Sequence, residues 1–197
     1  ISDVSGYVGN FDTTGKAEGR VRTIEHGIVI VATGAQEHRP TEYLYGEHER
    51  VLTQLELEEQ IVGQTETLTG ARSLVMIQCV GCRQADKNYC SRVCCGQAVK
   101  NALKLKTLTP ELDIHIRFRD MRTYGFKEDA YREAAERDIK FIRYEPEHKP
   151  LVEAAGNGLK VTVADPVLGH NLELEADLLV LSAAVDPAES TQEIARL

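Results

Sequence analysis

Apolar positions along the chain predict buried strands that alternate with helices. Continuous apolar runs, which are typical of strands covered on both faces, occupy residues 27–32, 73–78 and 177–184. Apolar and polar residues alternate over 114–118, which predicts another strand. Further strands are expected within 4–25, at 140–144, and in a hairpin of 159–164 and 172–175 around a turn at Gly169.

Four helices are predicted from spacing and capping signals. Thr53 followed by Glu56 has the capping-box pattern, so a helix is expected over about 53–62. Apolar or small residues recur at the spacing of one buried helix face, which predicts a helix over about 91–106 with Ser91 as its N-cap. The other two predicted helices cover 131–138 and 189–197.

The predicted order of elements indicates the fold class. From residue 72 the order is β-α-β-α-β-hairpin-β, which implies a parallel sheet with right-handed crossovers. We therefore expect an α/β fold of the nucleotide-binding type, with helices on both faces of the sheet, and two domains at 1–69 and 70–197. The turn after the strand 73–78 reads QCVGCR and lacks the Gly-x-Gly-x-x-Gly of dinucleotide sites. NAD(P) is not expected there.

Composition and charge narrow the classes of function. The 197 residues include 23 Lys and Arg against 31 Asp and Glu, a net charge of −8. Because an acidic surface repels phosphate backbones, no nucleic-acid partner is expected. No apolar run approaches the roughly 20 residues of a membrane span. The chain begins at Ile1 without a signal segment and ends at Leu197 within a predicted helix, so we expect a segment of a longer polypeptide.

Candidate chemistry is concentrated in five cysteines at positions 79, 82, 90, 94 and 95. Cys79 ends a predicted strand, and the last three bracket the first turn of a predicted helix, where backbone N–H groups favour thiolate over thiol. All-thiolate ligation without histidine is typical of an iron–sulfur cluster. The spacing matches neither common ferredoxin pattern, so chemistry alone leaves open which four of the five would be ligands.

Other interpretations of the five cysteines agree less well with their spacing. Structural zinc usually takes two paired knuckles, and only Cys79 and Cys82 have that spacing. Disulfides are disfavoured because no secretory signal is visible. Unligated cysteines normally occur singly rather than in fives. An iron–sulfur site is therefore the main hypothesis, and a zinc-stabilised structural or interaction module without redox activity is the alternative.

Several segments resemble one known family. The segments 76–81 (MIQCVG) and 89–95 (YCSRVCC) together resemble the A-type subunit of heterodisulfide reductase and its relatives, the quinone-interacting membrane-bound oxidoreductase flavoproteins. The likeness covers essentially the whole chain, because the segments 51–56, 119–125 and 176–182 are also similar to that family. The Cys-x3-Cys-Cys element alone would be a much weaker signal.

The resemblance implies a thioredoxin-reductase-like flavoprotein that carries FAD and [4Fe–4S] clusters. The residues that match the family's cluster ligands are Cys79, Cys90, Cys94 and Cys95. The family commonly has Ser or Ala at the position of Cys82, which is therefore expected to be a non-ligand neighbour, with an exchange of roles with Cys79 left open. The resemblance assigns 1–69 to an FAD-binding domain and 70–197 to a unit like an NAD(P) domain that runs into a return to the FAD domain.

The resemblance also suggests contacts to the flavin. Lys100 matches a family lysine that faces the isoalloxazine ring, where a cation would stabilise the reduced flavin. Thr33, Gly34 and Ala35 match the turn at which two-domain flavoproteins approach FAD, and Glu56 is a candidate partner for the flavin or for Lys100. The family's Gly-x-Gly-x-x-Gly turn for FAD is absent from this sequence. We therefore expect FAD to be held weakly or not at all.

Taken together, the resemblance implies an electron-transfer segment of an iron–sulfur flavoprotein oxidoreductase, inactive when alone. Its expected partners are the other subunits of a redox complex and soluble electron carriers, with a homodimer as one arrangement of the longer protein. The expected location is the cytoplasm and the expected context is anaerobic metabolism.

Overall fold

The computed structural model describes residues 1–65, 68 and 70–196. The chain divides into two compact units, of which the first combines Ile1–Gln36 with the segment from Val185 onward and the second is Glu37–Ala184. These units divide at other residues than the expected domains, because the strand and helix between 51 and 63 belong to the second unit. The assignment of the chain to FAD and NAD(P) domains stays a prediction.

The first unit is built on a three-stranded antiparallel sheet in the order β1-β2-β3. Its two turns contain Gly9 and Gly19, both at positive φ, which glycine adopts without strain. A short pair of strands, β4 and β13, and the helix α5 complete the unit. The bounds of these elements are β1 Asp3–Tyr7, β2 Asn10–Ala17, β3 Arg20–His26, β4 Ala35–Glu37, β13 Val185–Pro187 and α5 Thr191–Ile194.

The buried strand predicted at 27–32 is wrong. Residues 27–34 form no strand in the structure, and Ile28 and Ile30 are 68% and 81% exposed. A continuous apolar run is buried as a strand only when other strands pair with it and other layers cover both of its faces. No described residue of the first unit is buried. The apolar pattern therefore lacks the partners that would convert it into a strand.

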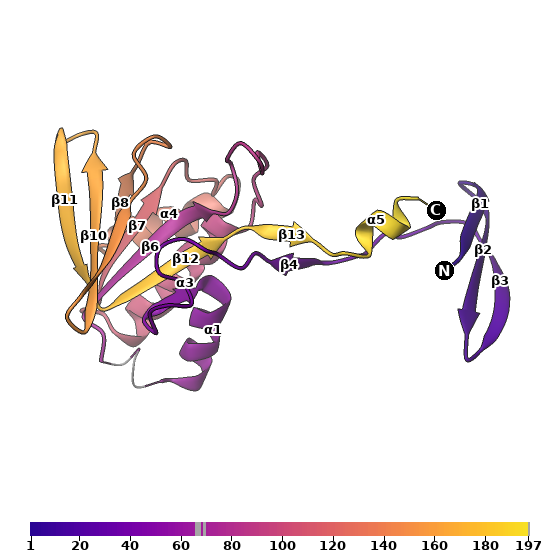
Figure 1. The fold of residues 1–197 in the computed structure, drawn as a ribbon, viewed down its shortest axis with the longest axis horizontal. Coiled ribbons are helices and arrows are strands. Elements are labelled where there is room, and N and C mark those ends of the chain that lie inside the picture. The colour runs from indigo at the N-terminus through magenta and orange to yellow at the C-terminus, as the bar shows by residue number, and fades with distance from the viewer. Residues whose placement is uncertain (66–67, 69, 197) are drawn as a thin grey trace. The chain divides into compact units, whose positions relative to one another are not determined.

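The second unit is organised around a five-stranded parallel sheet in the order β5-β12-β6-β7-β8 (Figure 1). The helix α3 connects β6 to β7, and α4 connects β7 to β8, as the predicted order of elements required. The bounds are β5 Val51–Thr53, α1 Gln54–Gly63, β6 Ser73–Val80, α3 Cys94–Leu108, β7 Asp113–Phe118, α4 Lys127–Glu136, β8 Lys140–Arg143 and β12 Leu178–Ala183.

The two faces of this sheet carry different layers. Leu74 and Met76 of β6 pack in one core cluster with Ala98 of α3 and with residues of α1 and α4. The alternate residues Val75 and Ile77 pack in a second cluster. That cluster lies against an antiparallel sheet of β9 Leu151–Ala155, β10 Gly158–Asp165 and β11 His170–Ala176, which includes the predicted hairpin.

The α/β fold class is confirmed, but the prediction of helices on both faces is wrong. In Figure 1, α1 and α3 lie on one side of the parallel sheet, and β10 and β11 lie on the other. The strand β9 was not predicted, and the alternation of 159–164 predicts a hairpin without showing which layer it would cover. Only the packing of β10 against β6 and β12 decides this.

The predicted cap of α1 is confirmed, whereas that of α3 is wrong. The Thr53 side chain accepts from the backbone N–H of Glu56, and the Glu56 side chain accepts from the backbone N–H of Thr53, which completes a capping box. The helix α3 starts only at Cys94, with Val93 as an N-cap that makes no side-chain hydrogen bond. Arg92 has a φ of +63°, so the chain cannot be helical there and Ser91 cannot cap the helix.

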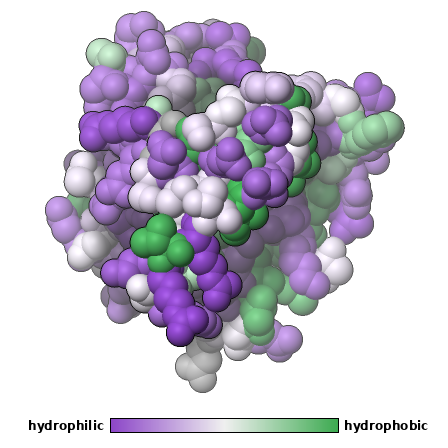
Figure 2. Space-filling view, turned by 90° about the vertical axis from the view of Figure 1, so that its right-hand side faces the viewer, coloured by the Kyte–Doolittle hydropathy of each residue, from purple (hydrophilic) through white to green (hydrophobic). Residues whose placement is uncertain are grey.

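On the face that Figure 2 shows, hydrophilic residues predominate and apolar residues lie among them. None of the helices in the described part of the chain is long and apolar enough to cross a membrane.

Candidate functional site

The cysteines gather where the central strands of the parallel sheet end. Cys79 lies near the end of β6, and Cys94 and Cys95 are the first two residues of α3. The Sγ of Cys94 lies 3.8 Å from the carbonyl oxygen of Ala183 at the end of β12. The Sγ of Cys95 lies 3.7 Å from the carbonyl oxygen of Asp120, just beyond β7. The carboxyl ends of the strands in such a sheet are the usual place for a ligand.

All five cysteines are free thiols. Four of them are buried, and Cys90 is half-buried. Burial, together with negative charge on Cys95 and Cys79, raises the pKa of Cys94 to about 11. Burial also raises the pKa of Cys95. A negative charge on one cysteine thus raises the pKa of another. The predicted ligands are therefore close enough to influence one another's ionisation.

Cys79 and Cys82 interact directly. The Cys82 thiol hydrogen-bonds to Cys79, which lowers the pKa of Cys79 and raises that of Cys82. Arg83 and Arg119 lower the pKa of Cys79 further through their positive charge, and Arg83 Nη1 lies 3.8 Å from its Sγ. Cys79 is therefore the thiol of this pair that ionises more readily to a thiolate.

The loop after β6 is held in an unusual backbone conformation. Positive φ angles occur at Cys79 (+64°), Gly81 (+73°) and Arg83 (+56°), and again at Arg92 (+63°). Non-glycine residues in this region cost about 1–3 kcal/mol each and concentrate at functional sites. Turns of left-handed residues also direct backbone N–H groups towards anions, as in many phosphate and iron–sulfur sites.

The sequence alone assigned no role in this loop to the two arginines that fix it, Arg83 and Arg119. Arg83 Nη2 donates to Asp120 Oδ2 at 2.6 Å, and Arg119 Nη1 donates to the carbonyl oxygen of Arg83 at 2.7 Å. The Arg119 guanidinium also lies over the ring of Tyr144, 5.7 Å from its centroid. An arginine one residue after a cysteine turn was the available signal, but its partners lie 36 and 37 residues further along the chain.

The donor set has the chemistry of an iron–sulfur site, but the thiols do not converge on one point. Among the described residues, no three His, Cys, Asp or Glu side chains are placed to hold a metal ion. The donors are nevertheless all thiols, four of them buried, next to two arginines that offset negative charge. These features fit a cluster held by thiolates better than a site built on nitrogen or oxygen ligands.

Lys100 lies on α3 and is paired with a glutamate. Its Nζ donates to Glu58 Oε1 at 2.7 Å, and Gln97 donates to the same oxygen at 2.9 Å. The partner is thus Glu58 and not the expected Glu56. Lys100 also lines an apolar groove between α3 and α4, together with Val93 and other residues.

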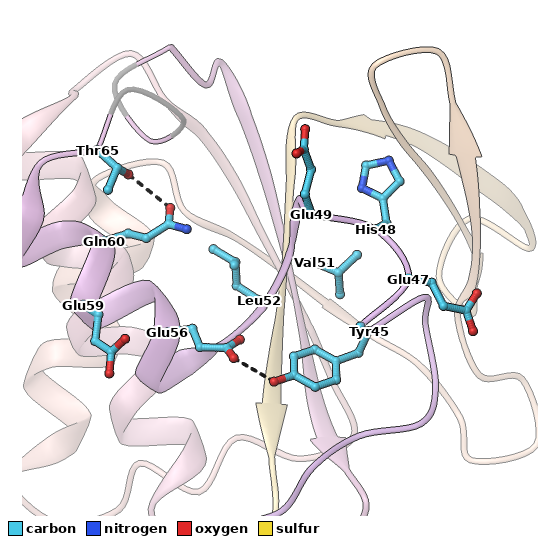
Figure 3. Close-up of a pocket in the computed structure, with 11 residues that line it drawn as sticks. Tyr45, Glu47, His48, Glu49, Val51, Leu52, Glu56, Glu59, Gln60 and Thr65 are labelled. Carbon is cyan, nitrogen blue, oxygen red and sulfur yellow. Dashed lines mark hydrogen bonds between the residues drawn. The ribbon is translucent and has the colours of Figure 1, made fainter.

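Glu56 is used in the local structure of α1. One carboxylate oxygen accepts from the backbone N–H of Thr53 at 2.8 Å, and the other accepts from Tyr45 Oη at 2.7 Å and from Arg39 at 3.2 Å. Glu56 also lines a pocket whose other walls include Glu49 and Gln60 (Figure 3). No cysteine lines this pocket.

The turn at Thr33, Gly34 and Ala35 belongs to the first unit, and the cysteines belong to the second. Gly34 has a φ of +72°, and Ala35 begins β4. Thr33 Oγ1 lies 3.3 Å from Thr191 Oγ1. The flavin roles of these residues, of Lys100 and of Glu56 stay predictions.

Comparison with solved structures gives the fold. An ornithine N-hydroxylase of Kutzneria sp. 744, solved with reduced FAD and NADP⁺, aligns over 93% of this chain and 52% of its own, with a TM-score of 0.53 and 12% identity. At that identity the likeness shows the fold alone, which is the α/β fold that the sequence predicts.

Comparison with curated proteins gives the particular relatives, although no family model matches the chain. The iron–sulfur A-type subunit of CoB–CoM heterodisulfide reductase from Methanocaldococcus jannaschii is 38% identical over 189 residues, which cover 87% of this chain and 28% of the relative. The A-type subunit of ferredoxin:CoB–CoM heterodisulfide reductase from Methanosarcina acetivorans is 33% identical, over 86% of this chain and 26% of its own length.

The predicted resemblance is therefore confirmed: over most of its length the chain is similar to the A-type subunit of heterodisulfide reductase. It spans a little over a quarter of the length of these relatives. The curated relatives are named as subunits of a reductase, which is the class of enzyme that the sequence predicts.

Proposed function

We propose that the chain is the electron-transfer segment of a heterodisulfide reductase A-like oxidoreductase, in which Cys79, Cys90, Cys94 and Cys95 hold one [4Fe–4S] cluster. The observation that supports this most is the gathering of the five thiols at the ends of β12, β6 and β7, in a relative of subunits named as iron–sulfur proteins. When bound, the cluster would supply one-electron transfer at a site that the protein encloses.

The residues around the thiols would bind the cluster and limit its charge. Arg83 and Arg119 would offset the charge of the thiolates, because both already lower the pKa of Cys79. Asp120 holds the Arg83 guanidinium in place at 2.6 Å. The hydrogen bond that Cys82 donates to Cys79 supports the proposal that Cys82 is a neighbour of the ligands rather than a ligand itself.

We further propose that this site lies beside a flavin in the complete protein. Lys100, the turn Thr33–Gly34–Ala35 and Glu56 are the proposed contacts to FAD. Lys100 would have to exchange its ion pair with Glu58 for the flavin, since its Nζ lies 2.7 Å from Glu58 Oε1. The chain by itself is expected to bind FAD weakly. The proposed partners are other subunits of a redox complex and soluble electron carriers.

Anaerobic reconstitution with iron and sulfide tests the cluster. We expect broad visible absorption and about four irons per chain, as a [4Fe–4S] site requires. Stoichiometric zinc binding without iron uptake would instead support the alternative, a zinc-stabilised structural module, which the close pair Cys79 and Cys82 also suits.

Single Cys→Ser variants test the ligand set. We expect loss of iron in the variants at positions 79, 90, 94 and 95, and retention in Cys82→Ser, which is the matched control because Cys82 is also buried in the same loop. Retention in Cys79→Ser with loss in Cys82→Ser would show that the two cysteines exchange roles.

A further inference from the structure

The side chain of Gln78 has no partner in the folded chain. It is 0% exposed, and neither its amide nitrogen nor its amide oxygen has a hydrogen-bond partner among the residues that the structure describes. Two other buried amides are satisfied, because Asn101 donates to Gln54 Oε1 at 2.8 Å and Gln54 donates to Ser182 Oγ at 3.1 Å. A buried amide without partners is costly and calls for a group that the protein alone does not supply.

The strand geometry sets the direction of this side chain. Successive side chains of a strand point to opposite faces of the sheet. Leu74 and Met76 of β6 pack in the core cluster that contains Ala98 and Val99 of α3. Gln78 lies two residues after Met76 in the same strand, so its side chain extends from the same face of the sheet, which α3 covers.

The same region holds the two cysteines that begin α3. Cys94 contacts the carbonyl oxygen of Ala183 on β12, and Cys95 contacts that of Asp120 beyond β7. In the sheet, β6 lies between β12 and β7. The two thiols, one beside the end of β12 and one beside the end of β7, therefore flank the end of β6. Gln78, at the end of that strand and next to Cys79, is therefore between them.

We propose that Gln78 is a positioning residue of the cysteine site, whose amide N–H groups donate to the sulfur atoms of the bound cluster. This inference rests on the proposed function. A neutral donor fits this place because it can stabilise thiolate and sulfide without adding charge. Hydrogen bonds to sulfur favour the more reduced, more negative state of a cluster, so Gln78 would raise its reduction potential.

The test compares Gln78→Met with Gln54→Met in the 197-residue chain. Both variants replace a fully buried amide with an unbranched apolar side chain, but Gln54 is satisfied by Asn101 and Ser182. After anaerobic reconstitution, we expect Gln78→Met to keep the iron content and to shift the midpoint potential to a more negative value. Gln54→Met should leave the potential unchanged.

A thermal readout on the iron-free chain gives a second, independent measurement. Without a cluster the Gln78 amide is unsatisfied, so Gln78→Met should raise Tm, whereas Gln54→Met breaks existing hydrogen bonds and should lower it. In the iron-loaded chain the gain from Gln78→Met should disappear. If Gln78→Met cannot be purified, Gln78→Glu keeps the shape, replaces donors with acceptors, and is expected to lower the potential as well.

The outcomes separate this inference from the proposed function. Absence of iron uptake by the unmodified chain overturns the proposed function and the role of Gln78 with it. Normal iron uptake with an unchanged potential in Gln78→Met overturns the role of Gln78 alone. Equal shifts in Gln78→Met and Gln54→Met would also overturn it, because the effect would then arise from packing.

Discussion

Gly81 illustrates how a single residue sets the geometry of the cysteine loop. It lies between Cys79 and Cys82, and its φ of +73° is one that L side chains adopt only with strain. A Cβ at this position would also overlap the ring of His38. The residue therefore allows both the left-handed turn and the close approach of another segment.

Gly81→Ala should destabilise the chain by about 2 kcal/mol or more, since the strain of a left-handed alanine adds to the overlap with His38. Thermal unfolding and iron content after reconstitution measure the effect. Gly125→Ala is the matched control, because Gly125 has a φ of +64° with open space around it. Equal losses in the two variants would mean that His38 is not the obstacle.

At the scale of elements, one aspartate joins the starts of β6 and β12. Asp177 Oδ2 accepts from the backbone N–H groups of Arg72 at 2.7 Å and of Ser73 at 3.1 Å. These hydrogen bonds, that from Arg72 first, lower the pKa of Asp177 from the ordinary aspartate value of 3.8. Strand ends more than 100 residues apart in sequence are thus aligned by a charged group.

Asp177→Asn should lower stability at neutral pH by about 1–2 kcal/mol, because the charged acceptor is lost. A lowered carboxyl pKa contributes stability that is full above the unfolded pKa and is lost as pH falls through the folded pKa. The deficit of the variant should therefore shrink as pH falls below about 4. Urea unfolding between pH 3 and 7 measures this, with Asp86→Asn, a charge change at an exposed site, as control. A deficit that does not depend on pH would contradict the assignment.

At the scale of the whole molecule, the core and the cysteines lie in the same unit. Every residue of the three core clusters falls within 37–184. The described residues of the first unit include none that is buried. Since apolar burial supplies most of the stability of a fold, the second unit should not depend on the first.

A chain of residues 37–184 should therefore unfold in one cooperative transition, with a Tm within a few degrees of that of the 197-residue chain. It should also take up the same iron per chain, because it contains all five cysteines. Calorimetry and iron analysis on the two chains test this. Loss of iron binding in the shorter chain, with its unfolding transition intact, would show that the first unit contributes to the site.

Local signals predicted those features that depend on neighbouring residues. The capping box of α1, the alternation in β7 and the cysteine spacing all lie within a few residues, and each element was found where it was expected. The strand predicted at 27–32 is wrong because its burial depends on partners from other segments. The predicted start of α3 is wrong because nothing in the sequence indicates the left-handed turn at Arg92.

The sequence by itself determined the α/β fold class, the concentration of thiols after β6 and the relationship to the A-type subunit of heterodisulfide reductase. Only the tertiary structure decided that an antiparallel sheet covers one face, that Lys100 pairs with Glu58, and that the amide of Gln78 is buried without a hydrogen-bond partner among the described residues. The reason is physical: hydrogen-bonding patterns along a segment are local, whereas the neighbours of a buried side chain come from strands and helices far apart in the chain.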